Sequence, residues 1–140
     1  MFGVRYATMA NRFLLPNTAG REFKQSVKEL FELDRSFLQQ VRALCQEGTQ
    51  DGSQMSDRLV RIHLLEDQIQ AHLKGMSSAE QTYYRQLLPI NRKLVSELEQ
   101  INAYLRSRPQ LLGTGYSQAA VEVLDNLEDA ILRVQRSYTA

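Results

Sequence analysis

The sequence predicts an all-α protein, an antiparallel bundle of about four amphipathic helices in which the first and third are the longest. Along four stretches the apolar residues recur at steps of three and four, which places them on one face of a helix. The strict alternation typical of strands is rare. Short loops join the stretches and favour antiparallel neighbours. Residues 18–140 are expected to form one helical domain, and residues 1–17 a flexible N-terminal arm.

The first helix is expected from about Thr18 to Glu47, where Gly48 and Gly52 begin a loop. Its apolar positions step by three and four, so their side chains share one buried stripe. The stripe consists of Phe23, Val27, Leu30, Phe31, Phe37, Leu38, Val41, Leu44 and Cys45.

The second helix is expected from about Ser56 to Lys74, because the Ser56 hydroxyl can accept a free backbone N–H at the helix start. Gly75 is expected to end it in the left-handed conformation. The apolar stripe of this helix consists of Leu59, Ile62, Leu65, Ile69 and Leu73.

The third helix is expected to begin at Ser77 or Ser78, each of which has a Glu or Gln three residues later, as in a capping box. Pro89 lacks a backbone N–H and should kink or restart the helix, and Arg108-Pro109 should end it. The apolar set is Tyr84, Leu87, Leu88, Leu94, Val95, Leu98, Ile101 and Leu105.

The fourth helix is expected from about Ser117 to Tyr138 and has the most regular pattern in the chain. Because one amphipathic helix gains little stability alone, the four stripes are expected to pack together. The stripe of the fourth helix consists of Ala120, Leu124, Leu127, Ile131, Val134 and Tyr138.

Two polar residues interrupt these stripes. Asp34 shares its heptad position with apolar residues of the first helix, and Asn91 does so in the third. Buried polar residues cost stability but can fix helix register. One hypothesis pairs Asp34 with Asn91 across the two helices; the alternative is that Pro89 rotates its segment and leaves Asn91 exposed.

The sequence offers no convincing catalytic, cofactor or metal site, so we expect a protein that is not an enzyme. His63 and His72 lack the further ligands that zinc needs and are expected to be exposed. The segment around His72 resembles the phosphoacceptor motif of histidine phosphotransfer domains, but only one residue separates His72 from Lys74 where the family has two. Cys45 is expected to be a buried apolar residue rather than a nucleophile.

Charge and hydropathy narrow the class of partner. The net charge is +1 and Lys and Arg are not clustered, which argues against nucleic acid. No apolar stretch is long enough for a membrane span. A single cysteine makes no internal disulfide, and no signal-peptide pattern is present, so a cytoplasmic location is expected.

Tyrosine, arginine and leucine gather at the end of the third helix and in the following loop. The residues are Tyr104, Arg106, Arg108, Leu111, Leu112 and Tyr116. Aromatic residues and arginine are favoured in protein interfaces, so these positions form the best candidate recognition surface. The alternative is that Leu111 and Leu112 only cap the bundle.

The size, the near-neutral charge, the asparagine-containing third helix and the Gly-Tyr turn at 112–116 together resemble the flagellar type III export chaperones of the FlgN and FliT kind. The resemblance implies a cytoplasmic chaperone that binds the amphipathic helix of an exported subunit and keeps it unassembled. The fourth helix could itself occupy the groove and be displaced by the client. The partner-binding residues expected on this reading are Leu98, Ile101, Tyr104, Leu105, Arg108, Leu111, Leu112, Tyr116, Leu124, Leu127 and Ile131.

Two alternatives remain open at this point. The chain could be a self-associating structural or regulatory bundle, such as a homodimer in which a second copy fills the groove. It could also be a histidine phosphotransfer domain. No cofactor is expected on the chaperone or the self-association reading.

Overall fold

The computed structural model describes the backbone of residues 2–48 and 52–139, and the side chains of residues 20–48 and 55–139. Within those ranges the chain is an all-α bundle without strands. The helices are α1 (Phe2–Glu47), α2 (Gly52–Lys74), α3 (Ser78–Tyr84), α4 (Leu87–Arg106) and α5 (Gly115–Thr139), with a short 3-10 turn, η1 (Pro109–Leu111). The expected fold class is therefore confirmed.

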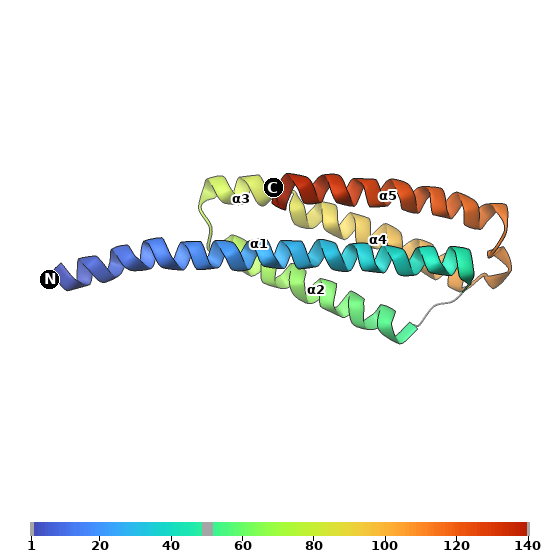
Figure 1. Ribbon diagram of the computed structural model, residues 1–140, viewed down its shortest axis with the longest axis horizontal. Coiled ribbons are helices and arrows are strands. Elements are labelled where there is room, and N and C mark those ends of the chain that lie inside the picture. Colours follow the sequence, from blue (N-terminus) through green and yellow to red (C-terminus); the bar gives the residue numbers. More distant parts are fainter. Residues whose placement is uncertain (1, 49–51, 140) are drawn as a thin grey trace.

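The four long helices alternate in direction (Figure 1). α1 runs one way, α2 returns, α4 runs parallel to α1, and α5 returns to bring the C-terminus back beside α3. α1 contacts α2, α4 and α5, whereas α4 contacts α5 more extensively than it contacts α2. α1 is thus the central element of the bundle.

α1 begins at Phe2, well before the expected start at Thr18. The backbone of residues 2–17 is therefore helical rather than extended, and this part of α1 projects beyond the other helices (Figure 1). Pro16 lies within the helix, so this proline does not end α1. That this segment behaves as a flexible arm stays a prediction.

The expected third helix is divided in two. α3 has 7 residues and α4 has 20, so α5, with 25 residues, rather than the third helix is the second longest. The break at Arg85 and Gln86 places Pro89 in the first turn of α4, where backbone N–H groups have no partner within the helix. The restart predicted from Pro89 is confirmed, and so is the cap, because the Ser77 hydroxyl accepts the Glu80 N–H at 3.3 Å.

Two helix ends differ in how glycine is used. Gly48 follows α1 with φ of +71°, and its N–H donates to the Leu44 carbonyl at 3.0 Å. Gly75 was expected in the same left-handed conformation but does not adopt it. α2 instead ends in a tighter turn, in which the Gly75 and Met76 N–H groups donate to the His72 and Leu73 carbonyls at 3.1 Å.

The core contains the stripes that the sequence predicts. Every expected apolar residue of α1 from Phe23 to Cys45 is buried, and so are Ile62, Leu65 and Ile69 of α2. Burying apolar side chains in this way contributes roughly 1.5–3 kcal/mol for each large residue. From α4 and α5 the core receives Leu87, Leu88, Leu94, Val95, Leu98, Leu105, Ala120, Leu124, Leu127 and Ile131.

Candidate protein-binding surface

Two tyrosines and an arginine lie stacked at the end of the bundle where α4 leads through η1 into α5. The Tyr104 and Tyr116 ring centroids are 5.1 Å apart, and the Arg108 guanidinium carbon lies 3.9 Å from the Tyr104 centroid. Tyr104 is 39% exposed and Tyr116 is 45% exposed. We call Tyr104, Arg108 and Tyr116 the open tyrosine stack.

The turn after α4 brings Tyr116 back onto Tyr104. The backbone continues through Pro109–Leu111 in a single 3-10 turn, and Gly113 then reverses direction with φ of +79°. The buried Ser117 hydroxyl accepts the Gly113 N–H at 3.1 Å and donates to the Thr114 carbonyl at 3.0 Å. This hydrogen-bonded turn holds the first residues of α5 beside the last turn of α4.

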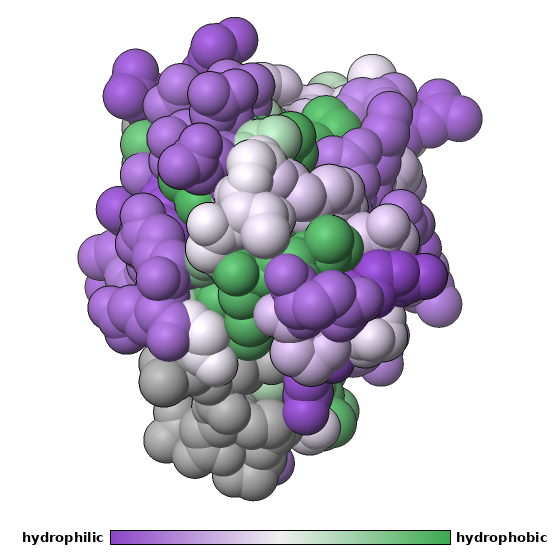
Figure 2. Space-filling view, turned by 90° about the vertical axis from the view of Figure 1, so that its right-hand side faces the viewer, coloured by the Kyte–Doolittle hydropathy of each residue, from purple (hydrophilic) through white to green (hydrophobic). Residues whose placement is uncertain are grey.

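Leu111 and Leu112 pack beneath this turn and are half-buried against the core. Figure 2 views this end of the molecule and shows hydrophobic atoms reaching the surface in its middle, between hydrophilic side chains at either side. Leu112 lies beside Gly48 at the end of α1, so the half-buried leucines cap the bundle, and they precede Tyr116 of the open tyrosine stack in the same turn.

The other expected partner-binding residues are divided between surface and core. Ile101 is half-buried on α4. The remaining five are buried in the core and cannot contact a partner while the bundle is closed. They could meet a client only if α5 moved away from α1. They are Leu98, Leu105, Leu124, Leu127 and Ile131.

Arg106 and Arg108 have no acidic partner among the described residues. The Arg108 guanidinium donates to the Ser107 hydroxyl at 2.9 Å, and Arg106 is exposed. No carboxylate in the described part of the chain forms an ion pair with either arginine. Their charge is thus free for an anionic group of a partner.

Cys45 lies beside this end, in a hollow of about 330 Å³ between α1 and α5 that Gly113 and Ser117 also line. The cysteine is buried, and burial raises the pKa of its thiol. A raised pKa lowers the thiolate fraction and with it the reactivity. The expectation of an apolar, buried cysteine is confirmed.

α5 is attached to α1 by charged groups as well as by its apolar stripe. The Arg42 guanidinium donates to Asp125 at 2.6 Å and to Glu128 at 3.0 Å, and Gln39 also donates to Glu128 at 3.0 Å. The Arg42 side chain is only 17% exposed, so these contacts are partly shielded from water.

The opposite end of the bundle holds a second aromatic group, which we call the closed aromatic cluster: Phe23, Tyr83, Tyr84 and Tyr138. The Phe23 and Tyr84 rings meet edge to face with centroids 4.6 Å apart, and Tyr138 lies 5.8 Å from Tyr84. The Tyr83 hydroxyl donates to the Ser137 carbonyl at 2.6 Å, which ties α3 to the end of α5. Burial is the main cause that raises the pKa of Tyr84 and of Tyr138.

A polar centre lies inside the bundle between these ends. Asp34 and Asn91 are both fully buried, but they do not pair, so that hypothesis is wrong. Asn91 instead donates to Glu66 at 3.3 Å, and the Arg92 Nε–H donates to the other Glu66 oxygen at 3.0 Å. Neither Asp34 oxygen has a hydrogen-bond partner, and desolvation, with the Glu66 charge, raises its pKa well above 3.8.

The sequence pattern did not predict that Glu66, Asn102 and Ser117 are buried, and of these Glu66 is the charged one. It is 3% exposed and shares its heptad position with Leu59 and Leu73 of the α2 stripe. The comparison of positions seven residues apart, which singled out Asp34 and Asn91, therefore contains the signal for Glu66 as well.

The two histidines have different surroundings. The His63 side chain is 62% exposed, as expected, and lies 3.8 Å from Glu66. The His72 side chain is only 28% exposed; its Nδ1–H donates to the Gln68 carbonyl at 2.8 Å and its ring meets the edge of Phe23. The expected exposure of His72 is therefore wrong, because the ring packs against α1.

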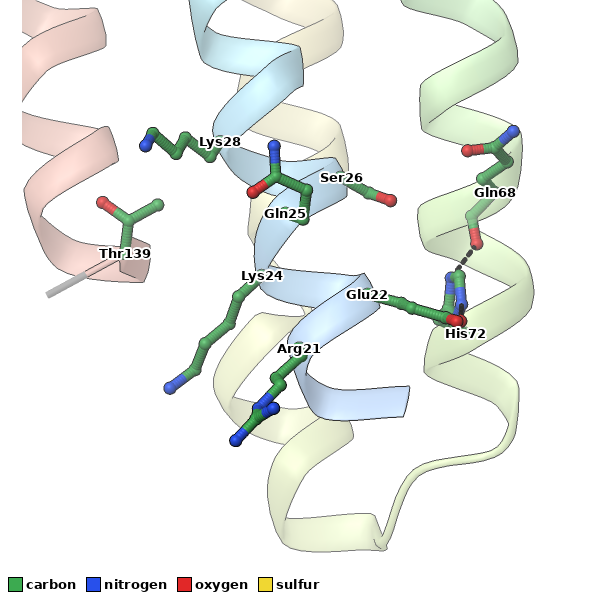
Figure 3. Close-up of a pocket in the computed structure, with 9 residues that line it drawn as sticks. All are labelled: Arg21, Glu22, Lys24, Gln25, Ser26, Lys28, Gln68, His72 and Thr139. Carbon is green, nitrogen blue, oxygen red and sulfur yellow. Dashed lines mark hydrogen bonds and ion pairs between the residues drawn. The ribbon is translucent and has the colours of Figure 1, made fainter. Parts of the chain in front are cut away.

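His72 also lines a hollow of about 780 Å³ formed mainly by α1 and α2, with Thr139 of α5 at one side (Figure 3). Glu22 points from α1 toward His72, with the carboxylate 3.8 Å from Nε2, while Arg21, Lys24 and Lys28 lie on the other side of α1. Among the residues whose side chains are described, no group of three or more His, Cys, Asp or Glu could hold a metal ion.

No described helix is both long and apolar enough to cross a lipid bilayer. Comparison of this chain with family models, with curated proteins and with solved structures yields no match.

Proposed function

We propose that this chain is a protein-binding helical bundle that acts as a cytoplasmic export chaperone or adaptor. Its client would be the amphipathic helix of a secreted, flagellar subunit, which it keeps unassembled. The observation that carries the proposal is the open tyrosine stack, where two large aromatic rings and an arginine lie exposed side by side.

Exposed tyrosines held in place by stacking are suited to binding a helix. Tyr104 and Tyr116 are positioned by α4, η1 and α5 before any partner arrives, so little conformational entropy is lost on binding. Tyrosine and arginine together supply apolar area and directional hydrogen bonds, which is why they dominate interface hot spots. The half-buried Leu111 and Leu112 extend the apolar area beside the stack.

The charges at this end define the chemistry of the client. Because Arg106 and Arg108 have no acidic partner within the described residues, we expect a client helix with apolar anchors at steps of three and four and an acidic residue beside them. Such a residue would pair with Arg108 in a charge-assisted hydrogen bond.

Isothermal titration with a peptide of the C-terminal helix of a flagellar subunit from the same genome tests the proposal. Replacing both Tyr104 and Tyr116 by alanine should weaken binding at least about tenfold, which is about 1.4 kcal/mol. The matched control replaces Val60 and Leu64, two exposed apolar residues on α2, by alanine and should leave the affinity unchanged. Absence of binding, or an equal loss in the control, would contradict the proposal.

A second route of binding displaces α5 from α1. Deleting residues 117–140 should then tighten client binding, but that deletion also removes the buried Leu124 and Ile131. Arg42→Ala is a milder test, since it weakens only the charged attachment of α5 to Asp125 and Glu128. Tighter client binding by this variant supports displacement, and unchanged or weaker binding opposes it.

Self-association is the second candidate function. Val60 is 59% exposed and Leu64 is 57% exposed, four residues apart on α2, where a second copy could cover them. Light scattering over a concentration series should then show a dimer that Val60→Ala with Leu64→Ala dissociates. A monomer at all concentrations excludes this candidate.

A further inference from the structure

A groove of about 520 Å³ lies where the end of α2, the α3 helix and the start of α4 meet, at the opposite end from the open tyrosine stack. Three basic side chains line it, one from each part of the chain: Lys74 at the end of α2, Arg85 after α3, and Arg92 on α4. Leu73, Leu88 and Pro89 form its apolar part. We call it the cationic groove.

The cationic groove contains no carboxylate among the side chains that line it. Lys74 and Arg85 are exposed and form no ion pair within the described residues. Arg92 donates its Nε–H to the buried Glu66 at 3.0 Å, so these two side chains form an ion pair. The side chains of the groove therefore present two unpaired positive charges, on Lys74 and Arg85, beside the paired Arg92, and no carboxylate of their own.

The hollow of Figure 3 differs in this respect. It is also lined by basic residues, but Glu22 is part of the same lining and lies 3.8 Å from His72. A carboxylate in the lining repels an incoming anion and lowers the local positive potential. A groove lined by basic residues alone therefore attracts an anion more strongly.

We propose that the cationic groove is a docking site for an acidic segment of a partner protein. Carboxylates of the segment would pair with Lys74 and Arg85, while an apolar side chain contacts Leu73, Leu88 and Pro89. Arg92 serves both sides: it holds Glu66 through Nε and keeps its terminal nitrogens for the segment. The site is separate from the open tyrosine stack and does not rest on the proposed chaperone function.

Gln70, Gln81 and Thr82 supply the polar rim of the groove. The Thr82 hydroxyl already donates to the Ser78 carbonyl at 2.8 Å, and the Gln81 amide donates to the Met76 carbonyl at 3.0 Å. These bonds hold the short α3 and the turn before it, so the rim is formed before the segment binds. A preformed rim lowers the entropic cost of docking.

Fluorescence anisotropy tests the proposal with a short fluorescein-labelled peptide in which glutamates flank a central leucine pair. The full chain should bind this peptide saturably, and added salt should weaken the binding. Lys74→Ala with Arg85→Ala should weaken it at least about tenfold. Both residues are exposed, so the variant is expected to fold.

The matched control is Lys93→Ala with Arg133→Ala, which removes the same charge from two exposed residues outside the groove. The control should change the affinity less than about twofold, and a lysine peptide of the same length should not bind. No saturable binding, or an equal loss in the control, would overturn the proposal. It is also overturned if inorganic phosphate binds through Lys74 and Arg85 while the glutamate peptide does not.

Discussion

The two ends of the bundle each gather tyrosines, but they use them differently. In the closed aromatic cluster, Tyr84 lies against the buried Phe23, and Tyr83 is hydrogen-bonded to the end of α5. In the open tyrosine stack, Tyr104 and Tyr116 contact each other and Arg108, and about two fifths of each side chain faces water. The first arrangement holds helices together, whereas the second leaves apolar surface for another molecule.

The difference shows that exposure alone does not indicate a binding surface, because Tyr83 is 57% exposed and yet its hydroxyl is bonded to the end of α5. Both groups combine tyrosines from two or more helices. What separates them is contact with the core: Tyr84 and Tyr138 are half-buried and Tyr84 meets Phe23 of α1, whereas the other group lies beside a turn at the edge of the bundle. Substitutions at the first should lower stability, and substitutions at the second should lower partner binding.

The largest expected effect is at the closed aromatic cluster. Phe23→Ala removes a ring that is 1% exposed and leaves a cavity beneath Tyr84, so the free energy of unfolding should fall by about 3–5 kcal/mol. Urea denaturation followed by circular dichroism measures the change. The comparison fails if Tyr104→Ala, at the open end, costs as much.

The polar centre between the two ends should make stability depend on pH through Asp34, which belongs to neither aromatic group. The folded-state pKa of Asp34 is raised above 3.8, so its contribution to stability is complete below pH 3.8 and is lost as the pH rises through the folded pKa. Asp34→Asn should therefore stabilise the protein at neutral pH and have no effect below pH 3.8. Urea unfolding at both pH values tests this, with the exposed Asp57→Asn as control; equal effects of the two variants would contradict it.

Alkaline pH should lower the stability of the protein through Tyr84 of the closed aromatic cluster. The folded-state pKa of Tyr84 is raised above 10.0 by burial, so stability present below pH 10.0 is lost as the pH rises through the folded pKa. Tyr84→Phe should lose less stability than the unchanged protein across that range. Unfolding measured on both sides of pH 10.0, together with a phenol absorbance titration, would detect the difference; parallel losses would argue against burial as its cause.

The smallest effect on stability is expected at the open tyrosine stack. Tyr116→Ala removes one exposed stacking contact, which is worth about 0.5–1.5 kcal/mol. Arg108→Ala should cost about 0.5–1 kcal/mol, the usual range for an exposed cation–π contact. Thermal unfolding measures both, and a loss above about 2 kcal/mol for either would mean that the stack is structural.

The sequence predicts the fold well because apolar periodicity reports directly on burial. The stripe of α1 and the stripe of α5 from Ala120 to Ile131 are buried as expected, and Ser77 caps α3 as its spacing with Glu80 predicts. The left-handed conformation predicted for Gly75 at the end of α2 is wrong, because glycine permits this conformation but does not require it.

The candidate site was predictable in its residues but not in its geometry. Tyr104, Arg108 and Tyr116 were singled out by composition, whereas Leu124, Leu127 and Ile131 were expected to bind a partner and lie in the core. The spacing of apolar residues is the same whether the stripe packs against its own chain or against a partner. The same ambiguity hid the closed aromatic cluster, because its rings come together only through the return of α5 to α3.

Hydrogen exchange followed by mass spectrometry tests the central claim most directly, that the open tyrosine stack is the partner-binding surface. The chain is compared with and without the client-helix peptide under the same conditions. The account predicts slower exchange over residues 101–118, which include α4's last turns, η1 and the start of α5. Slower exchange confined to residues 78–84 and 134–139, around the closed aromatic cluster, would contradict it.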